Sequence, residues 1–127
     1  MQRTFILTVV LALLSATSLN ALANRKSDII TLYNGDRVTG EVKSLLAGIL
    51  QVSTDSMGTV SIEWQDIANL ESRYNYEVRL SDGSRLFGSV ENSERPGQLT
   101  LVKAAGKRRL EWIEVVEIRP VEDSWTK

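Results

Sequence analysis

The chain contains no cysteine and no histidine among its 127 residues. Without cysteine it has no disulfide, no thiolate nucleophile and no sulfur ligand for a metal. Without histidine it lacks the commonest general base and the commonest metal ligand. These absences predict that the protein carries no metal and no other cofactor.

Catalytic sequence patterns are missing as well. The chain has no G-x-S-x-G, no H-E-x-x-H and no P-loop pattern. Glu63 and Glu111 occupy equivalent positions, but each alternates with apolar neighbours, which places both on an outer face. We therefore predict that the protein is not an enzyme, and we assign no catalytic residue.

Neither sign of charge is in large excess. The 15 basic and 16 acidic residues give a formal charge of −1, or −2 once Arg3 is removed with residues 1–23. This balance argues against bulk attraction to polyanions. We therefore expect no nucleic-acid partner.

Long apolar runs are confined to the N-terminus. Arg3 supplies a positive start, residues 5–14 are almost entirely apolar, and Ala21-Leu22-Ala23 is a typical cleavage site. The apolar run is shorter than the roughly 20 residues that a membrane span needs. We predict a signal peptide at residues 1–23, cleavage after Ala23, and export to the periplasm or cell envelope.

One nine-residue segment of the remaining chain occurs twice. Residues 32–40 read LYNGDRVTG, and residues 80–88 read LSDGSRLFG. Leu, Gly, Arg, an aliphatic residue and a second Gly recur with an offset of 48, which also separates Trp64 from Trp112. Two copies of one structural unit are predicted.

Alternation of apolar and polar residues predicts five short strands in each copy. The first strand of each copy ends in a turn, at Asn34-Gly35 and at Asp82-Gly83. A two-residue loop would point the aliphatic residues of paired strands to opposite faces, so we predict a three-residue loop that sets Ile30 opposite Val38. The second copy would likewise set Val78 opposite Leu86.

Four glycines have predicted structural roles. Gly35 and Gly83 would take the left-handed position of each turn. Gly40 and Gly88 lie inside the second strands, where glycine marks a bend or a close backbone approach. A single tight turn is predicted at residues 64–67, before the fifth strand.

Together these features resemble an SH3-like or Sm-like small barrel, and residues 30–40 resemble the first Sm motif. The expected fold is all-β, with two tandem five-stranded barrels after a cleaved signal peptide. Residues 72–75 would be a short linker. The expected parts are a signal peptide at 1–23, a polar leader at 24–27, a first barrel at 28–72, a second barrel at 73–120 and a polar tail at 121–127.

The signal peptide, the two glycine-containing units and the G-x-V-x-I-x-W-x-x-I segment at 58–67 resemble the N-terminal region of the bacterial salt-induced outer-membrane protein family. The resemblance covers roughly residues 28–120. In that family a membrane β-barrel generally follows, and here the sequence stops at Lys127. The resemblance implies either a fragment of a longer outer-membrane protein or a free-standing periplasmic module.

Two polar groups are candidate interaction surfaces. Asp36 and Arg37 lie at a hairpin tip, where they are either a ligand-binding pair or part of an ordinary solvated turn. Four cations flank a turn near residue 105. Their role is either to contact anionic lipid headgroups or to protect an edge strand from pairing. These cations are Lys103, Lys107, Arg108 and Arg109.

Apolar residues suggest where the two units meet. Trp64 and Trp112 form either a peptide-binding platform or a contact in the core or between the barrels, and we favour the contact. Other apolar residues fall outside the inward stripes, and we expect the interface between barrels to cover them. These are Leu45, Leu46, Phe87 and Ile113.

The function predicted from sequence is a non-enzymatic interaction module of the cell envelope. It would bind a protein or an envelope component in the periplasm, with peripheral association to the outer membrane as one form of that role. The alternative is an Sm-like module that binds nucleic acid, which the compartment and the charge balance disfavour.

Overall fold

The computed structural model describes residues 26–121. The predicted signal peptide, its cleavage site, residues 24–25 of the leader and residues 122–127 of the tail lie outside the described residues. None of the helical segments within 26–121 is long and apolar enough to cross a membrane.

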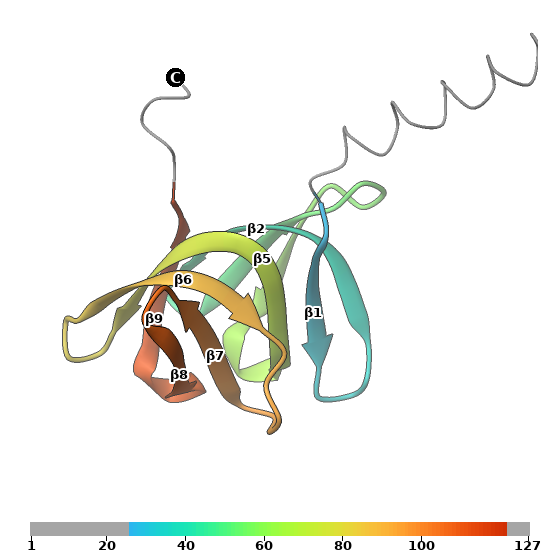
Figure 1. Ribbon diagram of the computed structural model, residues 1–127. Coiled ribbons are helices and arrows are strands. Elements are labelled where there is room, and N and C mark those ends of the chain that lie inside the picture. The colour runs from blue at the N-terminus through green and yellow to red at the C-terminus, as the bar shows by residue number, and fades with distance from the viewer. Residues whose placement is uncertain (1–25, 122–127) are drawn as a thin grey trace, which may run out of the picture.

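The described residues form an all-β fold of nine strands, which confirms the predicted class, with two single-turn 3-10 helices (Figure 1). Both 3-10 turns directly precede a strand, and the first confirms the tight turn predicted after the fourth strand. The elements are β1 Asp28–Leu32, β2 Arg37–Leu46, β3 Ile49–Ser53, β4 Thr59–Glu63, η1 Trp64–Asp66, β5 Ile67–Leu80, β6 Arg85–Glu91, β7 Gln98–Lys103, β8 Gly106–Glu111, η2 Trp112–Glu114 and β9 Val115–Pro120.

Four antiparallel strands close into a small barrel. β1 pairs with β2 and with β5, and β9 pairs with both β2 and β5, so the ring is complete. β3 and β4 extend the sheet from β2, and β6, β7 and β8 extend it from β5. In Figure 1, β5 arches across the molecule between β1 and the later strands.

The two repeats close this ring together by exchanging strand partners. In β2, the second strand of the first repeat, Leu45 pairs with Ile118 of β9, the last strand of the second repeat. The reverse contact also exists: Ser72, in the part of β5 that ends the first repeat, pairs with Val90 of β6. Each repeat therefore uses the other to complete its hydrogen-bonded ladder.

The linker predicted at residues 72–75 is wrong. These residues lie in the middle of β5, a single strand of 14 residues that ends the first repeat and begins the second. The pairing of β5 with β6 shifts register between Ser72 and Tyr76, so the chain bends there without leaving the sheet. Polar residues at 72–75 suggested a connection, but the ladder pairs at Ser72 and at Tyr76 keep this segment within one strand.

Both predicted hairpin registers are confirmed. Ile30 lies opposite Val38, and Val78 lies opposite Leu86. In the first hairpin, Leu32 N–H donates to Asp36 O at 2.8 Å, which leaves a three-residue loop. Gly35 and Gly83 have φ of +94° and +92°, in the region that glycine alone enters without strain.

Of the two roles predicted for Gly40 and Gly88, a bend or a close backbone approach, the structure shows a close approach at both. A β-carbon on Gly40 would lie 2.5 Å from the carbonyl oxygen of Ser53, and one on Gly88 would meet the carbonyl of Val102. The neighbouring strand thus crosses directly over each glycine. A larger residue at either position would force the two strands apart.

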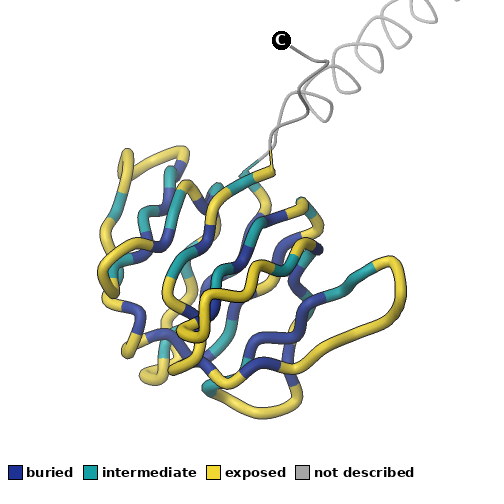
Figure 2. The backbone as a smooth tube through the Cα atoms, turned by 90° about the vertical axis from the view of Figure 1, so that its left-hand side faces the viewer, coloured by how far each residue is buried: buried dark blue, intermediate teal, exposed yellow. Residues whose placement is uncertain are grey.

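The core is shared by the two repeats, with buried positions along the strands and exposed ones in the loops (Figure 2). Its most unusual member is Asp28, whose side chain is fully buried. The carboxylate accepts hydrogen bonds from Val42 N–H at 2.9 Å, Ser72 Oγ at 2.5 Å and the Tyr76 hydroxyl at 2.7 Å. These three donors replace the water that the charged group loses on burial.

The predicted burial of four extra apolar residues is right for one of them. Leu45 is 1% exposed and lies in the contact between β2 and β9. Leu46, Phe87 and Ile113 are instead 62%, 55% and 88% exposed. The strands exchange hydrogen bonds directly, so no second layer of side chains is needed between the repeats.

Candidate protein-binding groove

Trp64 and Trp112 stack on each other at the centre of the contact between the repeats. Their ring centroids are 3.7 Å apart and the ring planes differ by 9°. The indole N–H of Trp64 donates to Trp112 O at 3.0 Å, and that of Trp112 donates to Trp64 O at 2.6 Å. This reciprocal arrangement supports the predicted contact between repeats and fixes both rings.

An open groove of about 570 Å³ lies beside the stacked rings. Both tryptophans are only 8% exposed, so they form a rigid floor, whereas Ile113 projects from the rim. The surrounding side chains are mostly apolar, with one carboxylate. The groove is lined by Ala47, Gly48, Ile49, Glu63, Trp64, Gln65, Trp112 and Ile113.

A tight hairpin shapes one wall of the groove. Ala47 and Gly48 connect β2 to β3 with φ of +52° and +77°, which is the pattern of a type I′ turn. The turn consists of these two residues alone, because Leu45 and Leu46 still belong to β2. Gly48 O accepts a hydrogen bond from Trp64 N–H at 2.9 Å, so the short turn is tied to the tryptophan floor.

Glu63 supplies the only charged side chain among the residues that line the groove. Its carboxylate accepts a 3.4 Å hydrogen bond from Gln65 Nε2, and within residues 26–121 it has no ion pair. A cation or a polar N–H group on a bound segment would therefore find an acceptor at this rim.

The predicted surface residues lie elsewhere. Asp36 bonds to Asn34 through its carboxylate and through its backbone N–H, so it stabilises its own hairpin. Arg37 is exposed at the start of β2, and no Asp36–Arg37 ion pair forms. Neither residue lines the groove, and the pair does not form a site in the described residues.

The basic group lies on and beside β8, an edge strand. Lys107 pairs with Glu91 at 2.8 Å, and Arg109 lies 3.8 Å from Glu94. Lys103 ends the neighbouring strand β7, opposite Gly106. The nearby acids reduce the positive field, and the cations mark an edge protected by charge.

Arg108 belongs to the same group but faces a different neighbour. It lies opposite Leu101, on the inward side of β8, and near the β5–β6 hairpin. The pKa of Asp82 in that hairpin is lowered, chiefly because the carboxylate accepts a hydrogen bond from Ser84 N–H, with Arg108 adding a smaller electrostatic contribution. The exposed hairpin tip is thus negatively charged at neutral pH.

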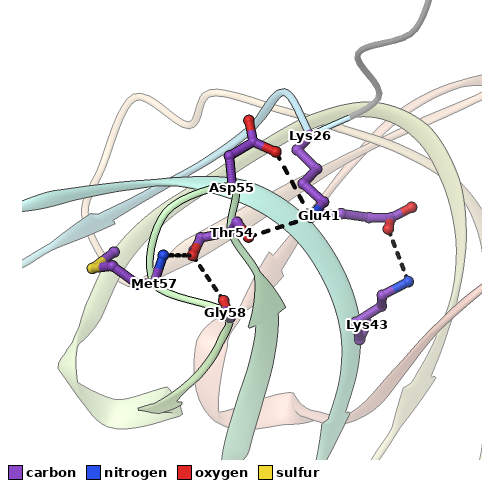
Figure 3. Close-up of polar contacts among 7 residues, drawn as sticks. All are labelled: Lys26, Glu41, Lys43, Thr54, Asp55, Met57 and Gly58. Atoms are coloured by element: carbon purple, nitrogen blue, oxygen red, sulfur yellow. Dashed lines mark hydrogen bonds and ion pairs between the residues drawn. The ribbon is translucent and has the colours of Figure 1, made fainter.

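A further exposed apolar residue, Met57, lies on the turn before β4 (Figure 3). The Thr54 hydroxyl donates to Gly58 O at 2.7 Å and accepts from Met57 N–H at 2.9 Å. Lys26 Nζ donates to Thr54 O at 3.3 Å and lies 3.7 Å from Asp55. These bonds fix the backbone of the turn, and in Figure 3 the Met57 side chain extends away from them.

No protein-family model, curated protein or solved structure matches the chain. The resemblance to the salt-induced outer-membrane family therefore stays a prediction. The two tryptophans stand out in the sequence, but the groove does not, because the turn at 47–48 and the exposed Ile113 create it. One signal was present: the position equivalent to Ile113 in the first repeat is Gln65, a polar residue typical of exposed sites.

Proposed function

We propose that this chain is a non-enzymatic exported interaction module of the bacterial cell envelope, and that it binds a protein segment in the groove beside Trp64 and Trp112. The observation that most supports this proposal is the apolar groove, which is lined in part by Ile113, a residue that is 88% exposed. Concave apolar surfaces with one or two polar groups are typical of binding sites. A bound segment would place an apolar side chain over the rings and an N–H or cation beside Glu63.

The rigidity of the floor favours binding over a merely structural role. The two indoles are held by stacking and by a pair of hydrogen bonds to each other's backbone. A surface that is already ordered loses little conformational entropy when a partner docks. Large aromatic rings also supply much of the binding energy in protein interfaces.

The cellular location and the finer fold are part of the same proposal. The signal-like residues 1–23 and the family resemblance favour the periplasm or cell envelope. Each repeat comprises five strands in the same order, with β5 shared between the two repeats and a 3-10 turn before the last strand of each. This order favours an interpretation as two interlocked SH3-like or Sm-like units.

The test is partner capture followed by matched substitutions. The protein from residue 24 onward is used to isolate a partner from envelope fractions. Binding of the purified partner to this protein is then measured by calorimetry. Ile113→Glu should weaken binding at least about tenfold, since it puts a charge at an apolar contact. Phe87→Glu is the control, because Phe87 is also exposed but lies outside the groove. Equal effects of the two variants would refute the groove as the site.

The alternative function, Sm-like binding of nucleic acid, would rest on the cations of β8. Two of the cations there, Lys107 and Arg109, have acidic neighbours. Binding of single-stranded RNA that weakens steeply with salt and is lost in Arg108→Glu would favour this alternative. The same RNA is therefore titrated beside the protein partner.

A further inference from the structure

The outer edge of β4 is open. Within residues 26–121, β4 pairs only with β3. Two backbone bonds show which groups face β3: Trp64 N–H donates to Gly48 O, and Gly58 O accepts from Thr54 N–H. Because backbone direction alternates along a strand, the even-numbered residues of β4 face β3 and the odd-numbered residues face outward.

Three residues thus direct unpaired backbone groups to the open edge. They are Thr59, Ser61 and Glu63, which alternate with the partly buried Val60 and Ile62 of the inner face. Such a row of N–H and C=O groups is a template for pairing with another strand. Proteins usually protect it with cations, proline or a bulge, and the five residues of β4 include none of these.

The equivalent edge strand of the second repeat is protected. β8 carries three consecutive cations, of which Arg108 lies on the inward side of the strand opposite Leu101. If two chains paired through their β8 strands, antiparallel and centred on Arg109, Arg109 of one chain would lie directly opposite Arg109 of the other. Like charges directly opposite each other disfavour strand pairing.

We propose that two copies of this chain pair through their β4 strands, antiparallel and centred on Ser61. This register sets Thr59 opposite Glu63, so the one charged residue of β4 never faces itself. All outward backbone groups of both strands then form hydrogen bonds. The pairing also covers part of Val60 and Ile62. Because it uses backbone groups of β4, this proposal does not depend on whether the groove binds a partner.

Met57 gives each copy a side-chain contact with the other. In the register centred on Ser61, the turn before Thr59 of one copy, which carries Met57, runs toward the residues after Glu63 of the other copy, where Gln65 lines the groove. Met57 is 63% exposed, and its turn is fixed by the Thr54 hydrogen bonds. Each copy therefore contributes an apolar residue to the rim of the other copy's groove.

The pairing is expected to be weak. Two strands of five residues and one methionine on each side bury less than the roughly 1,200 Å² of a standard stable interface. We expect a dimer that forms with rising concentration, with a dissociation constant in the micromolar range or above.

The first experiment uses the absence of cysteine. In the proposed register the two Ser61 Cα atoms lie about 5.5 Å apart, within the range of about 4.4–6.8 Å that a disulfide bridges. Ser61→Cys should form a covalent dimer under mild oxidation. Thr59→Cys, opposite Glu63, and Arg109→Cys, on the protected edge, should do so at least about tenfold more slowly. Similar rates for all three variants would refute the register.

The second experiment measures association by analytical ultracentrifugation. Proline at position 61 removes an outward N–H group and leaves the backbone bonds to β3 intact, although it also removes the exposed bond from Ser61 Oγ to Gln51 Oε1. Ser61→Pro should therefore fold and lose the dimer. Arg109→Pro, at the equivalent position of β8, should leave the dimer unchanged. Ser61→Lys also disrupts pairing, since it sets like charges opposite each other. A monomeric parent chain at millimolar concentration, or a dimer unaffected by Ser61→Pro, would overturn the proposal.

Discussion

The two repeats share their strands, their 3-10 turns and their tryptophans, yet their outer edges differ. β4 ends the sheet with one carboxylate and no cation, whereas β8 ends it with three consecutive cations. The shared positions form the core, and the different positions lie on the surface that a partner or a second copy can reach. Repetition therefore accounts for the fold, and the differences between the copies indicate where interactions occur.

One difference is buried. Asp28 and Tyr76 occupy equivalent positions in the two repeats, and their side chains bond to each other at 2.7 Å. Two aspartates there would bring two carboxylates together in the core, and two tyrosines would leave no carboxylate acceptor for Ser72 Oγ and Val42 N–H. The two repeats are thus complementary at this point, and one cannot replace the other.

The largest expected effect comes from separating the repeats. Residues 24–72 and 73–127, expressed alone, should each be unfolded by circular dichroism, because the cut divides β5 and removes strand partners from both halves. The intact chain from residue 24 should unfold in one cooperative transition. Two halves that melt at the temperature of the whole would show that the repeats are independent.

The stacked tryptophans test whether the repeats contribute equally to stability. Trp64→Ala and Trp112→Ala should each lower the free energy of unfolding by about 3–5 kcal/mol, since each removes a large buried ring. The double variant should lose less than the sum, because each ring is the other's partner. Urea unfolding measures all three values, and strictly additive losses would contradict the coupling.

The buried pair of Asp28 and Tyr76 tests a position where the repeats differ. Tyr76→Phe should cost about 1–3 kcal/mol in urea unfolding, since the buried carboxylate loses a donor. Tyr33→Phe is the control, because Tyr33 is 59% exposed and should change stability by less than about 0.5 kcal/mol. Equal effects would mean that the hydroxyl bond contributes little.

The smallest effect concerns the hairpin tips. Asp82 corresponds to Asn34 of the first repeat, and both side chains accept a bond from the backbone two residues later. Because the folded pKa of Asp82 is lowered, its contribution to stability is present above its ordinary pKa and is lost as pH falls through the folded value. Asp82→Asn should remove this acid dependence and lower the stability at pH 7 only slightly, because the amide oxygen can still accept the bond from Ser84 N–H. A carboxyl titration by NMR at or above 3.8 would contradict the assignment.

Comparison of the repeats could have predicted the exposed apolar residues. Phe87 corresponds to Thr39, and Ile113 corresponds to Gln65, so each apolar residue has a polar equivalent. A polar equivalent in the other repeat therefore predicts an exposed position for each of these apolar residues. Within a single repeat this difference is not visible, and the apolar residues then suggest an internal interface.

The offset of 48 also proved to be local. It holds for the paired hairpins and for the tryptophans, but the buried Leu50 and Leu99 are 49 apart. The second repeat has a longer connection before its third strand, of residues 92–97, and a shorter turn after it. Insertions in loops leave the core unchanged, because strand register is set by the buried face.

By itself the sequence determined most of the strands, the two hairpin registers, the positive φ of Gly35 and Gly83, and the need for glycine at positions 40 and 88. These follow from local sterics and from the alternation of side chains, which need only neighbouring residues. Only the tertiary structure decided that β5 runs unbroken between repeats, that their strands exchange partners, and that a groove opens beside Trp64 and Trp112. Those features depend on pairing between residues far apart in the chain. The local sequence pattern does not specify which of several equivalent strand edges pair with each other.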